Sequence, residues 1–202
     1  MIASPFERTV FLDCDTIILS ELDELFALLE RFDLLISHDV RRSSTLIEQS
    51  ANPKIPASFC QHNSGVMAFK KSPPMLELLK DWAFRYDQLK NPRDQVTLKD
   101  LLWESDVRFW VLPEEWNFRR VTQLDAWEPL DAYPRILHNH QLLRHIREKK
   151  PRTDSLADVL EFERLALKQE WRDAFKAIPE LKNAPFEKWH QIVMENRHRL
   201  SS

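Results

Sequence analysis

The chain contains almost no glycine: a single residue, Gly65, among 202, where about 7% is usual. Without further glycines no Gly-rich loop can wrap a phosphate group. This excludes P-loop nucleotide hydrolases and the glycine fingerprint of dinucleotide-binding proteins. Turns must be made by the 12 prolines and by Asn, Asp and Ser. Gly65 follows Asn63 and Ser64, and it could simply sit at a bulge or turn.

Cysteine, long apolar runs and blocks of like charge are also scarce. Cys14 and Cys60 are the only cysteines, too few for a disulfide framework. The first residues lack the basic and apolar stretches of a secretory signal, so a cytoplasmic location is expected. No apolar run approaches the roughly 20 residues of a membrane-spanning helix. The net charge of -3, with acids and bases interspersed, gives no reason to expect a nucleic-acid partner.

Strand and helix patterns alternate along the first 140 residues. Helices are predicted to start near Ser20, at Ser72-Pro73 and at Asn91-Pro92, with a polar loop over residues 40–60. Strands are predicted from apolar and β-branched runs at residues 8–13, 33–38, 66–69, 107–112 and 135–138. The alternation predicts an α/β fold with a sheet flanked by helices.

From Pro151 onward the pattern becomes helical and strongly charged. One apolar stripe carries Leu156, Leu160, Leu167 and Trp171, and a second follows with Phe186, Trp189 and Val193. We therefore expect residues 1–150 to form the main domain and residues 151–202 a C-terminal helical appendage.

Two carboxylates lie at the end of the first predicted strand. In an extended segment the side chains of Asp13 and Asp15 project to one face, while Cys14 points to the other. Two carboxylates held together favour a hard divalent cation. A D-x-D triplet also arises easily by chance in a chain with 32 acidic residues, so its position at a strand end carries the prediction.

Several segments, taken in order, resemble GT-A fold glycosyltransferases, especially those similar to glycosyltransferase family 8. The similar segments are Phe11–Thr16 and Glu21–Phe26 (metal-site strand and following helix), His62–Met67 (Asn-Ser/Thr-Gly-Val), Asp94-Gln95 (Asp-Gln), Leu112–Asn117 (Leu-Pro-x-x-Trp/Tyr-Asn) and Ile136–His138 (late strand with a metal-binding His). Each motif is weak alone, but the ordered set over roughly residues 5–140 is fairly specific.

The resemblance implies a GT-A-like, Rossmann-like mixed sheet and a metal-dependent transfer of sugar from a nucleotide-diphosphate donor. By it, Asp13, Asp15 and His138 hold Mn²⁺ or Mg²⁺; carboxylates with one imidazole suit Mn²⁺. His140 is the other histidine that could take this role. The acceptor, a glycan, lipid or protein, is not specified. Further donor contacts are implied for Asn63, Ser64, Gly65 and Asp13 in the sugar pocket and for Asp94 and Gln95, as catalytic residues, at the reacting face.

The chain departs from the family pattern in two places. The metal-site strand begins almost at Met1, where GT-A enzymes have an earlier nucleotide-binding strand and helix, so an N-terminally truncated domain is expected. The glycine expected after His138 is also absent from the run His138-Asn139-His140-Gln141.

Other interpretations remain open from the sequence. Residues 10–16 also resemble the first motif of haloacid dehalogenase-like phosphatases, in which the first Asp attacks phosphate and Mg²⁺ binds both acids. The later Gly-Asp motif of that class is missing from a chain with one glycine. A non-catalytic GT-A remnant that binds partners through its C-terminal helices is a third possibility. Asn91 and Asp94 could also be only the cap and first-turn acid of a helix.

Overall fold

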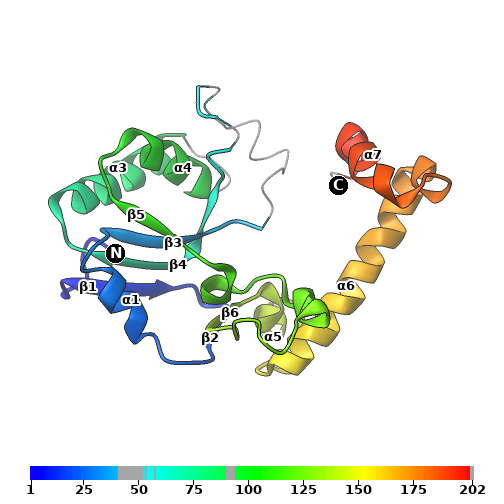
Figure 1. Ribbon diagram of the computed structural model, residues 1–202, viewed down its shortest axis with the longest axis horizontal. Helices are drawn as coiled ribbons and strands as arrows, with labels where there is room; N and C mark the ends of the chain where they lie inside the picture. Colours follow the sequence, from blue (N-terminus) through cyan, green and yellow to red (C-terminus); the bar gives the residue numbers. More distant parts are fainter. Residues whose placement is uncertain (41–51, 53, 57, 90–93, 201–202) are drawn as a thin grey trace.

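The computed structural model describes residues 1–40, 52, 54–56, 58–89 and 94–200 and shows a mixed sheet covered by helices on both faces (Figure 1). The predicted loop over residues 40–60 and the helix start at Asn91 lie largely or wholly outside the described residues. The elements are β1 Arg8–Leu12, β2 Thr16–Ile18, α1 Asp23–Leu28, β3 Leu34–His38, β4 His62–Lys70, α3 Pro73–Leu89, α4 Asp94–Glu104, β5 Phe109–Leu112, β6 Ile136–His138, α5 Arg144–Arg147, α6 Leu156–Ala177 and α7 Trp189–Asn196. Short 3-10 turns include η1 Glu114–Asn117, η2 Val121–Ala126, η3 His140–Leu143, η4 Pro179–Lys182, η5 Phe186–Lys188 and η6 Arg197–Arg199.

The main sheet has the order β1-β4-β3-β5. β4 runs antiparallel to both β1 and β3, while β3 and β5 are parallel. The predicted α/β class with a mixed sheet is therefore confirmed. β4 starts four residues before the predicted strand at Val66, and this extension carries Asn63, Ser64 and Gly65 into the sheet.

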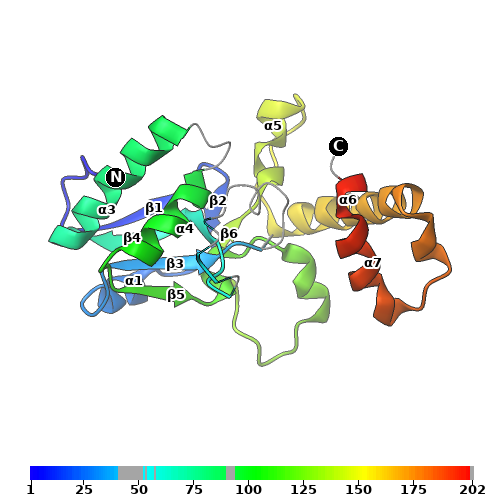
Figure 2. The ribbon, with the colours of Figure 1, turned by 90° about the horizontal axis from the view of Figure 1, so that it is seen from above.

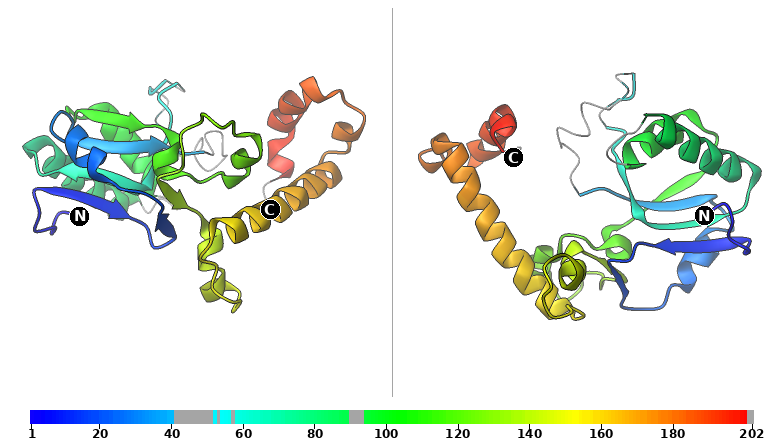
Figure 3. Two further views of the ribbon diagram at one scale, coloured as in Figure 1. Left: turned by 60° about the horizontal axis from the view of Figure 1, so that its bottom comes forward. Right: turned by 180° about the vertical axis from the view of Figure 1, so that it is seen from behind.

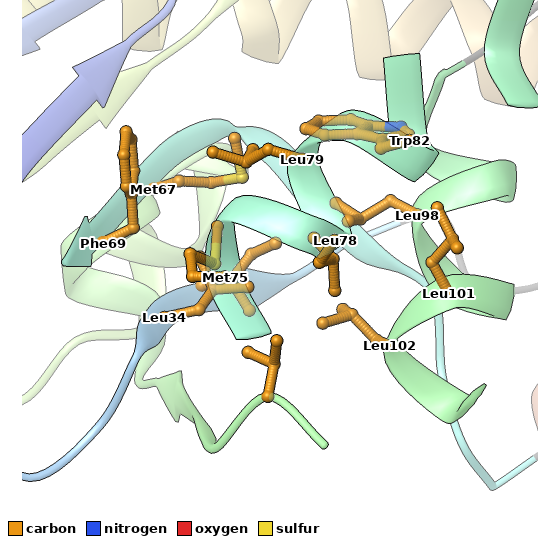
Figure 4. Close-up of a cluster of buried hydrophobic side chains, with 12 residues drawn as sticks. Leu34, Met67, Phe69, Met75, Leu78, Leu79, Trp82, Leu98, Leu101 and Leu102 are labelled. Atoms are coloured by element: carbon orange, nitrogen blue, oxygen red, sulfur yellow. The ribbon is translucent and has the colours of Figure 1, made fainter. Parts of the chain in front are cut away.

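α3 and α4 cover one face of this sheet (Figure 2). Their packing is apolar because Leu34 and Ile36 of β3 and Met67 and Phe69 of β4 alternate onto that face. Figure 4 shows Leu34, Met67 and Phe69 beside the apolar side chains of the two helices. The helix residues of the cluster are Met75, Leu78, Leu79, Trp82, Leu98, Leu101 and Leu102.

The opposite face of the sheet is covered by α1 and η1. Leu35 of β3 and Val66 and Ala68 of β4 pack there against Leu25, Leu29 and Trp116. A second, two-stranded sheet joins β2 to β6, and the sequence did not predict β2. Its three residues, Thr16–Ile18, are β-branched, which was the available signal.

The C-terminal helices extend away from the sheets (Figure 3). The first turns of α6 still belong to the main body, because Val159 shares a buried cluster with Phe118 and Leu137, and Arg164 forms an ion pair with Asp125. The far end of α6 forms its own cluster with η4 and α7. The boundary at residue 150 stays a prediction.

Two side chains of the predicted α6 stripe are exposed. Leu167 is 41% and Trp171 37% exposed, whereas Leu156 and Leu160 pack against the main body. The middle of α6 lies between the two clusters, so periodicity alone overestimated its buried face. No helix in the described part of the chain is long and apolar enough to cross a membrane.

Candidate metal centre

The segment Asp13–Asp15 connects β1 to β2. The backbone N–H of Asp13 donates to Gly65 O at 2.8 Å, and Thr16 Oγ1 donates to Asp13 O at 2.7 Å. A turn at Cys14 and Asp15 brings the two carboxylates together, instead of the continued strand that the sequence suggested. Cys14 is exposed.

Pairing of the short sheet brings His138 to these carboxylates. Thr16 of β2 is the register partner of His138, and the N–H of Asn139 donates to Asp15 O at 2.9 Å. His138 Nε2 lies 3.4 Å from Asp15 Oδ1 and 3.9 Å from Asp13 Oδ2. One ligand atom from each of the three residues lies within 4.8 Å of the others, so they could hold one metal ion.

His140, the alternative histidine, lies elsewhere. Its Nε2 is 3.9 Å from Glu163 of α6, and its side chain is about half exposed. The structure therefore groups His138, not His140, with the two aspartates.

A chain of hydrogen bonds fixes the orientation of the His138 ring. Asn117 Nδ2 donates to Asn63 Oδ1 at 2.9 Å, which leaves Asn117 Oδ1 to accept from His138 Nδ1 at 2.8 Å. Nδ1 then carries a proton and Nε2 faces the carboxylates, where it can donate to Asp15 and would offer its lone pair to a bound metal ion. This is the arrangement by which outer partners set the tautomer of metal-binding histidines.

Gly65 provides the space for that ring. A Cβ on Gly65 would lie 2.1 Å from His138 Cε1 and 2.8 Å from Asp13 Oδ2. Its φ is not in the left-handed region, so space and not backbone conformation requires glycine here. The pairing of β3 with β4 is also irregular at this point, where Ile36 pairs with Met67 but the next residue, Ser37, pairs with Asn63. The bulge that the sequence allowed at Gly65 is therefore present, and the space beside it is filled by His138 and Asp13.

The two carboxyl groups titrate differently. Burial raises the pKa of Asp13, and the neighbouring Asp15 and Asp94 carboxylates add to the rise, while His138 and Arg119 oppose it. The hydrogen bond with His138 lowers the pKa of Asp15. On acidification Asp13 therefore takes up a proton before Asp15 does.

The predicted pair Asp94 and Gln95 lies at the start of α4, beside the extension of β4. Ser64 Oγ donates to Asp94 Oδ2 at 3.1 Å, and Gln61 Nε2 donates to Gln95 Oε1 at 3.0 Å. Trp82 Nε1 also donates to Asp94 O at 2.9 Å. These bonds attach the helix start to the strand that carries Asn63 and Gly65. The sugar-binding and catalytic roles of these residues stay predictions.

The donor set fits a hard or borderline divalent ion, since it offers two carboxylates and one oriented imidazole. The sequence assigned no role to Asn117, although it ends the Leu-Pro-x-x-Trp-Asn motif. That motif was the available signal, but only the fold shows that Asn117 contacts His138.

The sequence model of the nucleotide-diphospho-sugar transferase family matches residues 8–151. No curated protein matches the sequence.

Solved structures that are similar to part of the chain include three that we describe. They are the galactosyltransferase LgtC with donor and acceptor sugar analogues (17% identity, TM-score 0.48, 68% of this chain and 54% of that one), GlyE of Streptococcus pneumoniae (20%, 0.44, 67% and 34%) and mouse xyloside xylosyltransferase 1 (19%, 0.44, 67% and 58%). The chain thus spans between 34% and 58% of the length of these proteins. The family match covers more than half of this chain, which therefore belongs to the nucleotide-diphospho-sugar transferase family.

Proposed function

We propose that this chain performs metal-dependent transfer of a sugar from a nucleotide-diphosphate donor to an acceptor. The observation that carries the proposal is the grouping of Asp13, Asp15 and His138, with Nε2 directed to the carboxylates, inside a chain of this family. The family implies the donor class. The acceptor is a glycan, lipid or protein, and cytoplasmic location and the lack of a nucleic-acid partner stay predictions from the sequence.

The chemistry requires charge stabilisation near the diphosphate. When the bond to the anomeric carbon breaks, negative charge develops on the leaving diphosphate, and a divalent ion held at this site would stabilise it. Asp13 and Asp15 would offer carboxylate oxygens to that ion, and His138 would offer Nε2. Mn²⁺ is the preferred ion and Mg²⁺ the alternative, because the set includes an imidazole.

The residues around the triad would position the donor. Asn117 and Asn63 hold the ring of His138, and Gly65 leaves room for it. Asp94 and Gln95, fixed to β4 through Ser64 and Gln61, are proposed to face the donor sugar.

Calorimetry with Mn²⁺ and a panel of nucleotide sugars tests the proposal. We expect Asp15→Ala to abolish Mn²⁺-assisted donor binding, while Asp81→Ala, an exposed aspartate on α3, leaves it unchanged. Donor affinity unchanged by Asp15→Ala would remove the central claim. Absence of any donor binding by the unmodified chain would favour the non-catalytic remnant.

The phosphatase alternative predicts a different result. It requires turnover of a generic aryl phosphate with Mg²⁺ that is lost in Asp13→Ala. The family membership supports transfer over this alternative, and such turnover would overturn the proposal.

A further inference from the structure

We propose that Arg119 binds the diphosphate of the donor beside the metal centre, with Asp39 as the residue that orients its guanidinium. The sequence pointed to neither residue. The inference rests on the proposed function and adds a binding group to it.

The backbone places Arg119 next to His138. Phe118 forms a parallel bridge with Leu137. The N–H of Phe118 donates to Ile136 O at 2.8 Å, and the N–H of His138 donates to Phe118 O at 3.1 Å. Asn139 Nδ2 donates to Arg119 O at 3.0 Å. This hydrogen bond holds the backbone of Arg119 against the residue that follows His138.

Side chains alternate between the two sides of the extended segment around Phe118, and this directs the Arg119 side chain toward the metal centre. Phe118 is fully buried in the cluster beneath β6, and in extended backbone its two neighbours point to the other side. One neighbour, Asn117, hydrogen-bonds the His138 ring, and the other is Arg119. Arg119 is therefore a cation on the side of Phe118 that faces His138 and the two aspartates.

The ion pair of Arg119 is with Asp39 and not with either aspartate of the triad. Nη1 lies 3.6 Å from Asp39 Oδ1, and Asp39 follows β3 with its side chain only 1% exposed. The Arg119 side chain is 28% exposed, and its Nε is buried without a hydrogen-bond partner.

Arg119 therefore has more guanidinium N–H donors than its ion pair with Asp39 can use. A guanidinium carries five N–H donors in a fork that fits two phosphate oxygens. At 3.6 Å the Asp39 pair restrains the guanidinium without a hydrogen bond of normal length. The exposed part of the Arg119 side chain leaves guanidinium donors that a diphosphate oxygen beside the triad could contact.

Arg119→Met tests the proposal, with the exposed neighbour Arg120→Met as matched control. Calorimetry would use Mn²⁺ alone, then Mn²⁺ with inorganic pyrophosphate and with uridine, guanosine, cytidine and adenosine diphosphates. We expect Arg119→Met to weaken diphosphate binding about 10- to 100-fold, the range of a charged hydrogen bond. Affinity for Mn²⁺ alone stays equal or rises, because a cation near the two aspartates has been removed. Arg120→Met should change neither affinity by more than about twofold.

A purely structural role predicts another pattern. Loss of the Asp39 pair would then lower the affinity for Mn²⁺ and for diphosphate together. If Arg119→Met does not fold, Asp39→Asn with Arg119→Met removes both members of the pair and carries the same test. Arg119→Lys should give an intermediate diphosphate affinity, since the charge stays but the fork is lost.

The outcomes separate this inference from the proposed function. If the wild type binds a diphosphate with Mn²⁺ and both Arg119→Met and the double variant bind it equally well, the role of Arg119 is overturned and the proposed function is not. A parallel loss of Mn²⁺ affinity also overturns the role of Arg119. Absence of diphosphate binding by the wild type overturns the proposed function and this inference with it.

Discussion

Replacement of Gly65 by alanine tests the geometry of the metal centre most directly. The added methyl would lie 2.1 Å from His138 Cε1, 2.8 Å from Asp13 Oδ2 and 2.9 Å from His138 Nδ1. Carbon atoms in contact are normally about 3.5–4.0 Å apart. The ring or the strand must therefore move by about 1.5 Å, the difference between the two separations.

Neither partner can move freely. The His138 side chain is 5% exposed, and its Nδ1 is held by Asn117. Gly65 accepts from Asp13 N at 2.8 Å and donates to Asn63 Oδ1 at 3.1 Å. Overpacking of a buried site costs about 1–3 kcal/mol, and loss of the His138 hydrogen bond about 1 kcal/mol more. We expect Gly65→Ala to lower the free energy of unfolding by about 2–4 kcal/mol and to displace Nε2 from the triad, which weakens Mn²⁺ binding.

A double-mutant cycle with His138→Ala isolates the clash. Urea unfolding would be measured for the wild type, both single variants and the double variant. Without the ring, Gly65→Ala should cost less than about 1 kcal/mol, because its φ is outside the left-handed region and Asp13 is half exposed and can move. Equal costs in both backgrounds would refute the reasoning. So would a Gly65→Ala protein with unchanged stability and Mn²⁺ affinity.

Two further predictions concern buried polar side chains. Asn117→Ala, which removes the acceptor of His138 Nδ1 and the donor to Asn63, should lower Mn²⁺ affinity about 10- to 100-fold, as for other partners of metal-binding histidines. Asn117→Asp keeps the acceptor and should recover part of the Mn²⁺ affinity in the same calorimetric measurement. Equal losses of Mn²⁺ affinity in the two variants would contradict the role of Asn117 in holding His138. Burial and the nearby His38 and Lys99 lower the pKa of His62 from 6.5 to about 4. Between these two pH values the unfolded chain binds a proton that the folded chain does not. The stability that is present above pH 6.5 is therefore lost as the pH falls toward 4. At about 1.4 kcal/mol for each pH unit the loss is about 3 kcal/mol. The free energy of unfolding of His62→Phe, measured from pH 4 to 7, should fall by about 3 kcal/mol less than that of the wild type. Wild-type and variant curves that run parallel over this pH range would contradict the prediction.

Local patterns predicted most of the sheet and its helices. The runs at Arg8, Asp33 and Arg135 became β1, β3 and β6 within one residue at their start, because strand type follows local composition and burial pattern. α3 was predicted from its start at Pro73, but the burial of its apolar residues is uneven. Met75, Leu79 and Trp82 are buried, whereas Tyr86 is 41% exposed, because burial depends on what the helix meets and not on periodicity alone.

The candidate site was also predicted only in part from the sequence. Residue type and motif order identified Asp13, Asp15 and His138, and they indicated the family that the sequence model confirms. The turn at Cys14 and the strand β2 were not predicted, although they bring these residues together. The contacts of Asn117, Arg119 and Asp39 had no signal of their own, because each depends on a partner distant in the chain.

The sequence by itself determined the composition of the site. A chain with one glycine cannot form a Gly-rich phosphate-binding loop, whereas an acidic pair at a strand end predicts a site for a divalent ion. The tertiary structure decided which histidine joins that pair, which tautomer it adopts and why the one glycine is needed. The physical reason is distance: His138 is held against Gly65 by residues more than 20 positions away. Local preferences along a chain do not specify such a contact. It arises only when β1, β4 and β6 meet.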